Sequence, residues 1–504
     1  MLVYITQIEQ GMLKIAGGNV MYPVDKKIYR QQQPMDEAYL SNGGVKEYYQ
    51  KIMKYFHDMT IDQRNKLKGT CDRRMMEEGV TFTLYRQEDH AALERTIPFC
   101  PIPRVIPEQE WKVLEKGLIQ RIRALNRFIW DIYHEQNIVK DGILSRKDVL
   151  SNCYFSLEMT KIRMAHDAYV AIAGIDLIRD SNGDYLVLED NLRTPSGFSY
   201  LYKSRDLMMR QASDIFSKHP VRDLNSSFNS FIDVLKSLDP GQKSNPVIAL
   251  LTPGRFNAAY YEHVYLAQQM GLELVEGQDL IHIDQKIYIK HTHGLKKVDV
   301  IYRRLDDDYI DPLCFRSDSL LGVPGLMSAF RAGNVMITNA PGTGIADDKA
   351  IYRFVPKFIK YYLNEEPILK NVPTYVMSNP EEREFVLQRL EQMVVKETSL
   401  SGGYGMLIGP TASEEEVELF RKKIINEPEK YIAQPTISLS TSPTIDNGQI
   451  VHRHIDLRAF VLSGGDRNVH VIPGGLTRVA MKEGSLVVNS SQGGGVKDTW
   501  VLNN

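Results

Sequence analysis

The sequence predicts a fold that mixes α+β and α/β parts, with a mainly helical N-terminal region and a separate βαβ unit. Three patterns favour this fold class. Residues 1–150 contain helically spaced apolar runs, residues 174–191 alternate in the manner of a β-hairpin, and residues 246–345 alternate between strand and helix. At 504 residues the chain is too long for one ordinary core, so we expect two to four compact units.

The clearest helix of the N-terminal region is expected from Glu108 to Gln136. Its apolar residues recur at helical spacing, which is typical of a helix packed on a core. They are Trp111, Leu114, Leu118, Ile122, Leu125, Phe128, Ile129 and Ile132. Residues 99–107 contain three prolines, and this pattern predicts an irregular segment just before the helix.

The hairpin prediction depends on the dipeptide Asn182-Gly183. Asn-Gly favours a two-residue turn because both central residues need positive φ. With that turn, Asp176 lies directly opposite Glu189, and Asn191 shares the face of Glu189 because side chains alternate along a strand. The apolar residues expected on the opposite face, in a core, are Ile175, Leu177, Leu186 and Leu188.

Asp176 and Glu189 would repel each other across this hairpin. At ~5 Å and an effective dielectric near 20, the repulsion costs roughly 3 kcal/mol. A divalent cation would remove it, and a set of oxygen ligands completed by Asn191 suits Mg²⁺, which also takes phosphate oxygens. We therefore predict Asp176, Glu189 and Asn191 as metal ligands. The alternative is an exposed hairpin whose acids face water, and a slip of one residue in register would break the alignment.

The βαβ unit, residues 246–345, is predicted from four segments. They are a strand at 246–253, a helix at 257–270, and strands at 272–275 and 298–305. In such units the loops at strand ends carry function. Arg303 and Arg304 should point to opposite faces, one clamping a carboxylate or phosphate and the other pairing with the acids at 306–308. A plain salt-bridge network is the alternative. Asn257, Tyr261, Arg303 and Arg304 are candidate substrate contacts.

Residues 375–435 are predicted to form a small unit in the order helix, strand, glycine loop, strand, helix, strand. Asn379 and Ser413 are expected to cap its two helices. Glycines at 402, 403 and 405 would let backbone N–H groups approach phosphate oxygens. The loop lacks Walker A spacing, and taken alone it resembles many hairpin turns. Lys396, on the strand just before it, turns it into a candidate nucleotide site.

Three further polar residues, Arg458, Arg478 and Asn489, lie on or beside apolar strands near the C-terminus. An unpaired charge there would be costly, and arginine stabilises charge on a transferring phosphoryl group. The alternative is that both arginines pair with acids on a sheet face.

The composition is that of an ordinary globular protein. A net charge of −2 gives no electrostatic footprint for nucleic acid or an anionic membrane, and no apolar run is long enough to span a bilayer. The first residues lack the segments of a secretory signal. We therefore expect a cytoplasmic protein without nucleic-acid or membrane partners. The four cysteines have no metal-ligand spacing and are expected to be free, buried thiols: Cys71, Cys100, Cys153 and Cys314.

Taken together, these motifs resemble a known family. The glycine-loop lid, the Asp456-x-Arg458 strand, Arg478 and Asn489 with its trailing glycines are similar to ATP-grasp ligases, especially the ribosomal-protein glutamate ligase branch. In that fold a Gly-x-Asp strand and a Glu-x-Asn strand come next, whereas here they lie upstream, within 163–199. The phrases at 188–197, 298–304 and 484–494 resemble the circularly permuted ATP-grasp type 2 family, which is related to glutathionylspermidine synthetase-like ligases.

The resemblance implies a circularly permuted ATP-grasp fold with ATP and Mg²⁺ as cofactors. The N-terminal region (1–150) would be followed by the hairpin segment (151–245), a pre-ATP-grasp-like substrate domain (246–345) and a nucleotide-binding region (346–504) with residues 375–435 as its lid.

The resemblance also implies a role for each site residue. Asp176, Glu189 and Asn191 would hold Mg²⁺. The phosphates would be contacted by Lys349, Lys396 and a flap of Gly402, Gly403 and Gly405, and the hinge beside adenine would run from Gln434 to Ile437. The residues facing the reacting phosphoryl group would be Arg193, Arg458, Arg478 and Asn489. Relatives of the D-alanine ligase type carry arginine two residues before the metal aspartate, where this chain has Gly174, so another arginine such as Arg193 or Arg458 must supply that charge.

The implied activity is an ATP-dependent carboxylate–amine ligase that forms an amide bond through an acyl phosphate. Its substrates would be small-molecule or peptide acids and amines, the acceptor being a polyamine, an amino acid or a peptide. Two alternatives are an ATP-grasp phosphotransferase that stops at a phosphorylated product, and a nucleotide-binding module without catalysis. Neither the substrates nor the oligomeric state follow from the sequence.

Overall fold

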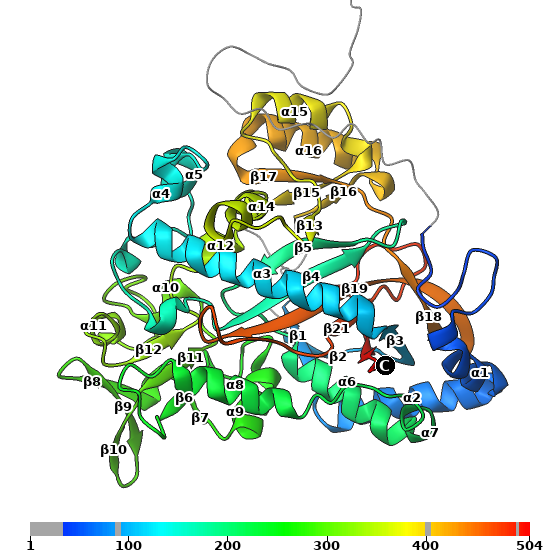
Figure 1. The fold of residues 1–504 in the computed structure, drawn as a ribbon, viewed down its shortest axis with the longest axis horizontal. Coiled ribbons are helices and arrows are strands. Elements are labelled where there is room, and N and C mark those ends of the chain that lie inside the picture. Colours follow the sequence, from blue (N-terminus) through cyan, green and yellow to red (C-terminus); the bar gives the residue numbers. More distant parts are fainter. Residues whose placement is uncertain (1–33, 86–91, 399–404, 490–492, 504) are drawn as a thin grey trace, which may run out of the picture.

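A large mixed sheet forms the centre of the computed structural model, which describes residues 34–85, 92–398, 405–489 and 493–503 (Figure 1). Within the described residues, nine strands form this sheet, and seven of them run in the order β13-β5-β4-β19-β21-β22-β3 while β18 and β20 pair with β19. Their bounds are β3 Phe99–Ile106, β4 Ile172–Arg179, β5 Tyr185–Asn191, β13 Lys370–Asn371, β18 Thr441–Asp446, β19 Gln449–Ser463, β20 Val469–Val471, β21 Leu476–Val479 and β22 Gly495–Val501.

The order of these strands brings distant parts of the chain together. β4, from the first half, pairs with β5 on one side and with β19, from the C-terminal part, on the other. β22 pairs in parallel with β3. The sheet therefore places the predicted hairpin beside the strands that carry Arg458 and Arg478, which is what the permuted order predicts.

Helices cover the central sheet. The long helix α3 (Glu108–Tyr133) crosses in front of it in Figure 1 and packs against β19 and β20, with all eight predicted stripe residues buried. Helix α6 (Phe198–Gln211) packs against β22. The other α-helices of the body are α1 Gln50–Asp58, α2 Ile61–Glu77, α4 Asn137–Lys140, α5 Arg146–Leu150, α7 Ser213–Phe216, α8 Ser226–Ser237, α12 Gly344–Asp347, α13 Lys349–Tyr352 and α14 Val355–Phe358.

A second, four-stranded parallel sheet confirms the predicted βαβ unit. Its order is β12-β11-β6-β7, with bounds β6 Ile248–Leu251, β7 Glu273–Val275, β11 Val300–Arg303 and β12 Met336–Thr338. Helix α9 (Tyr260–Met270) connects β6 to β7. Beyond β7 lies a meander of β8 Leu280–Ile283, β9 Lys286–His291 and β10 Gly294–Lys297, and α10 Asp307–Ile310 and α11 Leu326–Arg331 follow β11. Two short strands near the N-terminal helices pair with each other, β1 Thr81–Tyr85 and β2 Ala92–Thr96.

The lid has the element order that the sequence predicts, with one short strand added in front. Its sheet runs β14-β17-β15-β16. The bounds are β14 Tyr375–Val376, α15 Pro380–Leu387, β15 Met393–Glu397, β16 Leu407–Ile408, α16 Glu414–Asn426 and β17 Tyr431–Pro435. The side chains of Asn379 and Ser413 accept hydrogen bonds from the first turns of α15 and α16, as expected.

The described residues form two main hydrophobic clusters and a third, small one. Buried residues from all four predicted units join one continuous core, which extends from Ala38 to Val501. The lid has a separate cluster that includes Met377, Val395 and Phe420. The body therefore packs as one mass with the lid set on it, and the four-unit division stays a prediction.

The hairpin has the predicted pair of acids, but its turn and its register differ from the prediction. Asp176 does pair with Glu189, but Arg179 pairs with Tyr185 and the Asp180 N–H donates to the Asp184 carbonyl, so three residues (181–183) rather than two form the turn. A one-residue bulge at Leu188 compensates, because Leu177 pairs with Val187 while Asp176 pairs with Glu189. The predicted Asn-Gly turn was wrong, and the bulge restored the register.

The bulge also changes which apolar residues face the core. Val187 joins the main core beside Leu177, as a residue opposite it must. Leu186 and Leu188, predicted to face that core, instead pack with Ile178 in a small cluster that also holds Val372, Ile437 and Leu439. A slip of one residue moves a side chain to the other face of a sheet, which explains the correction.

Two further expectations were wrong. Residues 99–106 form the strand β3 instead of an irregular segment; β3 lies at the end of the sheet order, where proline is tolerated because fewer N–H groups must pair. Cys71 and Cys100 are buried thiols as expected, but Cys153 and Cys314 are exposed. In the described part of the chain, no helix is both long and apolar enough to cross a membrane.

Candidate active site

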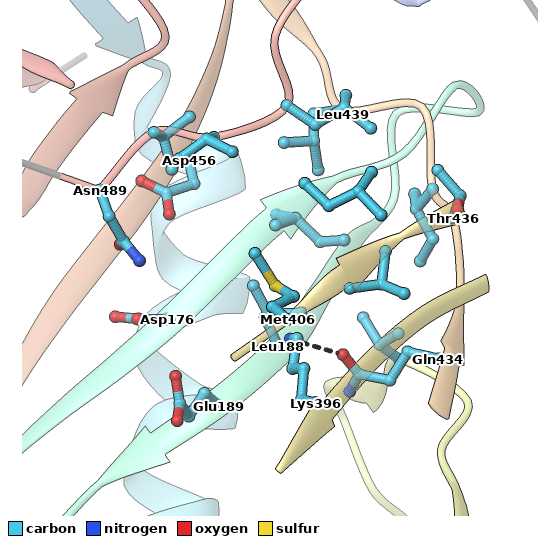
Figure 2. Close-up of a pocket in the computed structure, with 18 of the residues that line it drawn as sticks. Asp176, Leu188, Glu189, Lys396, Met406, Gln434, Thr436, Leu439, Asp456 and Asn489 are labelled. Atoms are coloured by element: carbon cyan, nitrogen blue, oxygen red, sulfur yellow. Dashed lines mark hydrogen bonds between the residues drawn. The ribbon is translucent and has the colours of Figure 1, made fainter. Parts of the chain in front are cut away.

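A cavity lies between the β4–β5 hairpin and the lid sheet. One side of it carries carboxylates and an amide (Asp176, Glu189, Asn489), and the other side carries Lys396 and Gln434 (Figure 2). Its apolar lining comes from both sheets and from the segments that join them, and includes Ile178, Leu188, Val394, Met406, Ile408, Ile437, Leu439 and Leu486. An apolar slot with a cationic end suits a flat base that carries phosphates.

Two lysines approach this cavity from different parts of the chain. Lys396 Nζ donates to Gln434 Oε1 over 2.8 Å, and Gln434 Nε2 donates to Thr374. Lys349, at the start of α13, lies 3.2 Å from a carboxylate oxygen of Glu189. Burial lowers the pKa of Lys396 to about 8, against the attraction of Glu189. An added anion would hold this lysine in its charged form.

Asp176 lies at the centre of a network of arginines. Arg458 Nε and Nη2 donate to its two oxygens over 2.6 and 2.8 Å, and Arg478 Nη2 donates over 2.9 Å. Burial works to raise the pKa of Asp176, but the two arginines outweigh it and hold the pKa at about 2. Arg478 also pairs with Asp456 and donates to Asn489 Oδ1 over 3.0 Å. Burial raises the pKa of the Asp456 carboxyl despite Arg478.

Gly174 makes room for one of these arginines. A Cβ at this position would lie 3.0 Å from Pro195 Cβ and 3.3 Å from Arg458 Cδ. The side chain of Arg458 thus lies over the position where an arginine was expected. Arg193 is engaged elsewhere, since its Nε donates to Asp347 over 2.7 Å and its guanidinium stacks 4.4 Å from the centre of the Tyr154 ring. Of the two arginines considered for this charge, Arg458 contacts the hairpin.

The predicted metal ligands form a partial oxygen cage. Asp176 and Glu189 lie opposite each other, and Asn191 Nδ2 donates to the Gly174 carbonyl over 3.1 Å, which leaves its oxygen as the ligand atom. Among the described residues, no three His, Cys, Asp or Glu side chains converge as a metal cluster. The donors therefore fit Mg²⁺ only if Asn191, water and phosphate oxygens complete the shell, which is its usual manner of binding. The two arginines occupy three of the roughly four lone-pair sites of the Asp176 carboxylate, which leaves one, on Oδ1, for a cation.

A second cavity lies on the other side of the Asp176 and Glu189 carboxylates, between the hairpin and the βαβ unit. It is larger, about 670 Å³ against about 160 Å³ for the first. Asp176, Glu189, Arg478 and Asn489 line both cavities. The other polar side chains of the second cavity include Tyr154, Asn191, Arg193, Ser196, Asn257, His263, Arg304, Asp306, Tyr309, Asp347 and Arg458.

Most predicted site residues converge on these two cavities. Gln434 and Ile437 line the first, and Asn257 and Arg304 line the second. Tyr261 and Arg303 are not among the described residues that line either one. Arg303 is fully buried, where it pairs with Asp307 and donates to three carbonyls. Gly405 has a left-handed φ of 65°, whereas Gly402 and Gly403 lie outside the described residues.

Sequence reasoning missed two carboxylates: one lines the second cavity, and the other supports an arginine that lines it. Asp347 accepts from Arg193 and from the backbone N–H of Leu192, and burial raises its pKa against the effect of Arg193. Glu262, fully buried in α9, pairs with Arg304. Asp347 lies beside the predicted Lys349, in the segment 346–349, and Glu262 lies in no motif; the partners of both carboxylates are distant in sequence. The one local signal for Glu262 is a carboxylate within a stretch, Tyr260 to Tyr265, whose other residues are aromatic or apolar.

The order of the hairpin and the lid around one cavity defines a circularly permuted ATP-grasp fold. A family model described as "Circularly permuted ATP-grasp type 2" matches residues 103–480. The chain belongs to this family, as the sequence motifs indicated.

Individual relatives fit this assignment. An "Uncharacterized protein" of Synechocystis sp. is 48% identical over 467 residues, covering 93% of this chain and 96% of the relative. A protein of Frankia alni named "Putative glutamate--cysteine ligase 2-3" is 38% identical over 468 residues; the match covers 92% of this chain but 53% of that protein. Among solved structures, a glutathione synthetase-like effector from Globodera pallida matches with a TM-score of 0.54 at 11% identity, covering 88% of this chain and 98% of the effector. At that identity the likeness concerns the fold alone.

Proposed function

We propose that this chain is an ATP-dependent, ADP-forming ligase that joins a carboxylate to an amine. The observation that carries the proposal is the wall shared by the two cavities. Asp176, Glu189, Arg478 and Asn489 face a slot suited to a nucleotide on one side and a larger polar cavity on the other. Because the same four residues line both cavities, the terminal phosphate of a nucleotide in the first would lie close to a substrate in the second. The names of the Frankia relatives support the same class, with amino acids as acid and amine.

The first cavity would take ATP, with adenine among the apolar side chains and the phosphates toward Lys396 and Lys349. Asp176, Glu189 and Asn191 would hold Mg²⁺, which supplies charge neutralisation at the phosphate oxygens. The glycine flap, of which only Gly405 lies within the described residues, would close over the phosphates. A cytoplasmic location, where ATP is supplied, fits this chemistry.

The reaction follows from what the wall can stabilise. A carboxylate oxygen of the acid attacks the γ-phosphorus, the bond from phosphorus to the ADP oxygen breaks, and an acyl phosphate forms. An amine nitrogen then attacks the carbonyl carbon, the C–N bond forms, the C–O bond to phosphate breaks, and the amine loses a proton. Arg458, Arg478 and Asn489 would counter charge on the transferring group, which is the main requirement of phosphoryl transfer.

The second cavity offers a place for the amine at its acidic end. Asp306 lines this end, and its side chain is 60% exposed with Arg193 at 3.9 Å. The neighbouring Asp307 is already paired with Arg303 and with the backbone of Gly342. Asp306 thus presents a carboxylate that would attract a cationic substrate amine before it reacts.

A phosphate-release screen tests the proposal. Purified protein would be incubated with ATP and Mg²⁺ and with a panel of acids crossed with amines, and free phosphate and ADP would be measured. We expect release that needs both an acid and an amine, together with an amide product. Phosphate transfer to the acid that ignores the amine would favour a phosphotransferase. ATP binding without turnover under every pair would favour a non-catalytic module.

A further inference from the structure

Arg304 is held by the protein itself at four points. Its Nη1 donates to the Pro195 carbonyl over 2.7 Å and to the Tyr302 hydroxyl over 3.3 Å. Its Nη2 donates to Ser196 Oγ over 2.6 Å and to Glu262 Oε1 over 3.1 Å. Arg304 lines the second cavity, yet it is 4% exposed, and Glu262 balances its charge. A guanidinium with this many protein partners is poorly suited to bind a substrate anion directly.

Glu262 fixes this arginine to the start of helix α6. Its Oε2 accepts hydrogen bonds from the backbone N–H groups of Gly197 and Ser199 over 2.8 and 3.0 Å, and from the Ser199 hydroxyl over 3.0 Å. The first N–H groups of a helix have no partner within the helix, and a carboxylate placed there is favourable. One buried carboxylate therefore joins α9, Arg304 and the loop that leads from β5 into α6.

The same loop holds Arg458, which lines the second cavity and contacts Asp176 of the shared wall. Arg458 Nη1 donates to the Ser196 carbonyl over 3.1 Å, while its other donors grip Asp176. A continuous chain of contacts thus runs from Glu262 through Arg304 and Ser196 to Arg458. It crosses from the βαβ unit to the central sheet and ends on the carboxylate proposed to hold the metal.

We propose that Glu262 and Arg304 are positioning residues for Arg458. Arg304 sets the place of Ser196, whose carbonyl, together with Asp176, fixes the orientation of the Arg458 guanidinium. This inference rests on the proposed function, because it assigns Arg458 to the transferring phosphoryl group. It reassigns Arg304, which the sequence suggested as a substrate contact, and it adds Glu262 and Ser196 to the residues on which turnover depends.

The first test compares a break in this chain of contacts with a break elsewhere. Glu262→Gln removes the charge that holds Arg304 and keeps the side-chain size. Asp498→Asn is the matched control: Asp498 is also a fully buried carboxylate that pairs with an arginine, Arg205, but it lines neither cavity. We expect Glu262→Gln to lower kcat by about 10- to 100-fold, as loss of an outer support of a metal ligand does, with the KM for ATP nearly unchanged. Asp498→Asn should keep its kcat.

A pair of variants at Ser196 separates positioning from folding. Ser196→Thr keeps the hydroxyl that accepts from Arg304 and should keep most of the activity, whereas Ser196→Ala should lower kcat. A thermal unfolding midpoint measured without ligand would check that Glu262→Gln and Asp498→Asn are similarly stable. If both lose kcat in proportion to lost stability, the role is structural and the proposal fails.

A double-variant cycle asks whether the effect passes through Arg458. If Ser196 acts by holding Arg458, then Ser196→Ala should add little to the loss already caused by Arg458→Lys. Additive losses would overturn the proposal. Calorimetric titration with Mg-ATP gives a second readout, in which Ser196→Ala and Arg458→Lys, alone and together, should leave the affinity for Mg-ATP nearly unchanged. Failure of the ligase proposal looks different, since then the unaltered protein would release no phosphate with any acid and amine.

Discussion

The two cavities share a wall, yet their other walls are built differently. The lid side of the first cavity belongs to a unit with its own hydrophobic cluster, and the charged lysine it contributes, Lys396, contacts an amide rather than an acid. The second cavity is enclosed by the body, where charged side chains are tied to one another, as Arg193 is to Asp347 and Arg304 to Glu262. An added anion would therefore balance Lys396 in the first cavity, whereas much of the charge around the second cavity is balanced by the protein itself.

Substitutions in the shared wall should have the largest effect on ATP turnover. Glu189→Gln is expected to lower Mg²⁺-dependent ATP turnover by about 10²- to 10³-fold with the fold intact, because Glu189 is partly exposed and its loss leaves no buried arginine unpaired. Turnover and the unfolding midpoint would be measured side by side. Glu273→Gln, at a partly exposed glutamate of β7 that also pairs with a lysine, serves as the control.

Asp176→Asn should behave differently from Glu189→Gln. It removes the charge that faces both Arg458 and Arg478, so besides abolishing turnover it should cost about 3–5 kcal/mol of the free energy of unfolding. Chemical denaturation measures this cost. Equal stability of the two variants would contradict the arginine network. Asp176 would then be only the metal ligand on a hairpin that the sequence predicts.

Substitution of Lys396 in the lid should have the next largest effect. This effect is on the affinity for ATP, and it should depend on pH. Because the pKa of Lys396 is lowered to about 8, the lysine loses its proton as the pH rises through 8, so affinity for ATP should fall from pH 7 to pH 9 by up to about tenfold per unit above 8. Lys396→Met should bind ATP weakly at pH 7 and lose this dependence. Lys422→Met, an exposed residue of the same lid, should keep both affinity and profile. A profile unchanged in Lys396→Met would remove this lysine from the site.

Sequence reasoning worked best where the signal is local. The lid could be predicted element by element because helix caps such as Asn379 and Ser413 and the strand with Lys396 act over a few residues. The βαβ unit followed for the same reason. Long-range pairing was less accessible. No local pattern predicts that Arg458 lies over Gly174 or that Glu262 supports Arg304, since these contacts arise only when distant strands and helices pack.

The hairpin shows that a correct site can follow from an incorrect local structure. The pairing of Asp176 with Glu189 was predicted from a two-residue turn, whereas a longer turn and the bulge at Leu188 produce it. Their register errors cancel at the acidic pair. They do not cancel at Leu186, which faces the side opposite to the one predicted. The face of a residue near a bulge depends on tertiary packing that the sequence does not reveal.

The acidic end of the second cavity should give a smaller effect. Asp306→Asn is expected to raise the KM for a cationic amine by about 2- to 5-fold, the range for a partly exposed ion pair, with kcat little changed. Asp308→Asn is a matched control, because Asp308 is the exposed neighbour two residues along and lines neither cavity. Steady-state kinetics at several amine concentrations would separate the two variants. Equal values of KM would place the amine away from Asp306.

The smallest effect is expected where the lid meets the body. Glu382 on α15 pairs with Arg353 of the body over 3.0 Å and accepts from the backbone N–H of Val376 over 2.6 Å, whereas Glu429 reaches Lys147 of the body through an exposed pair. Glu382→Gln should raise the KM for ATP by about 2-fold, because it loosens the strand that leads into the lid while Lys396 stays in place. Glu429→Gln should change nothing measurable, since exposed pairs contribute little. An effect of Glu429→Gln as large as that of Glu382→Gln would mean that the lid is held by its surface charges and not by the partly buried contact near Val376.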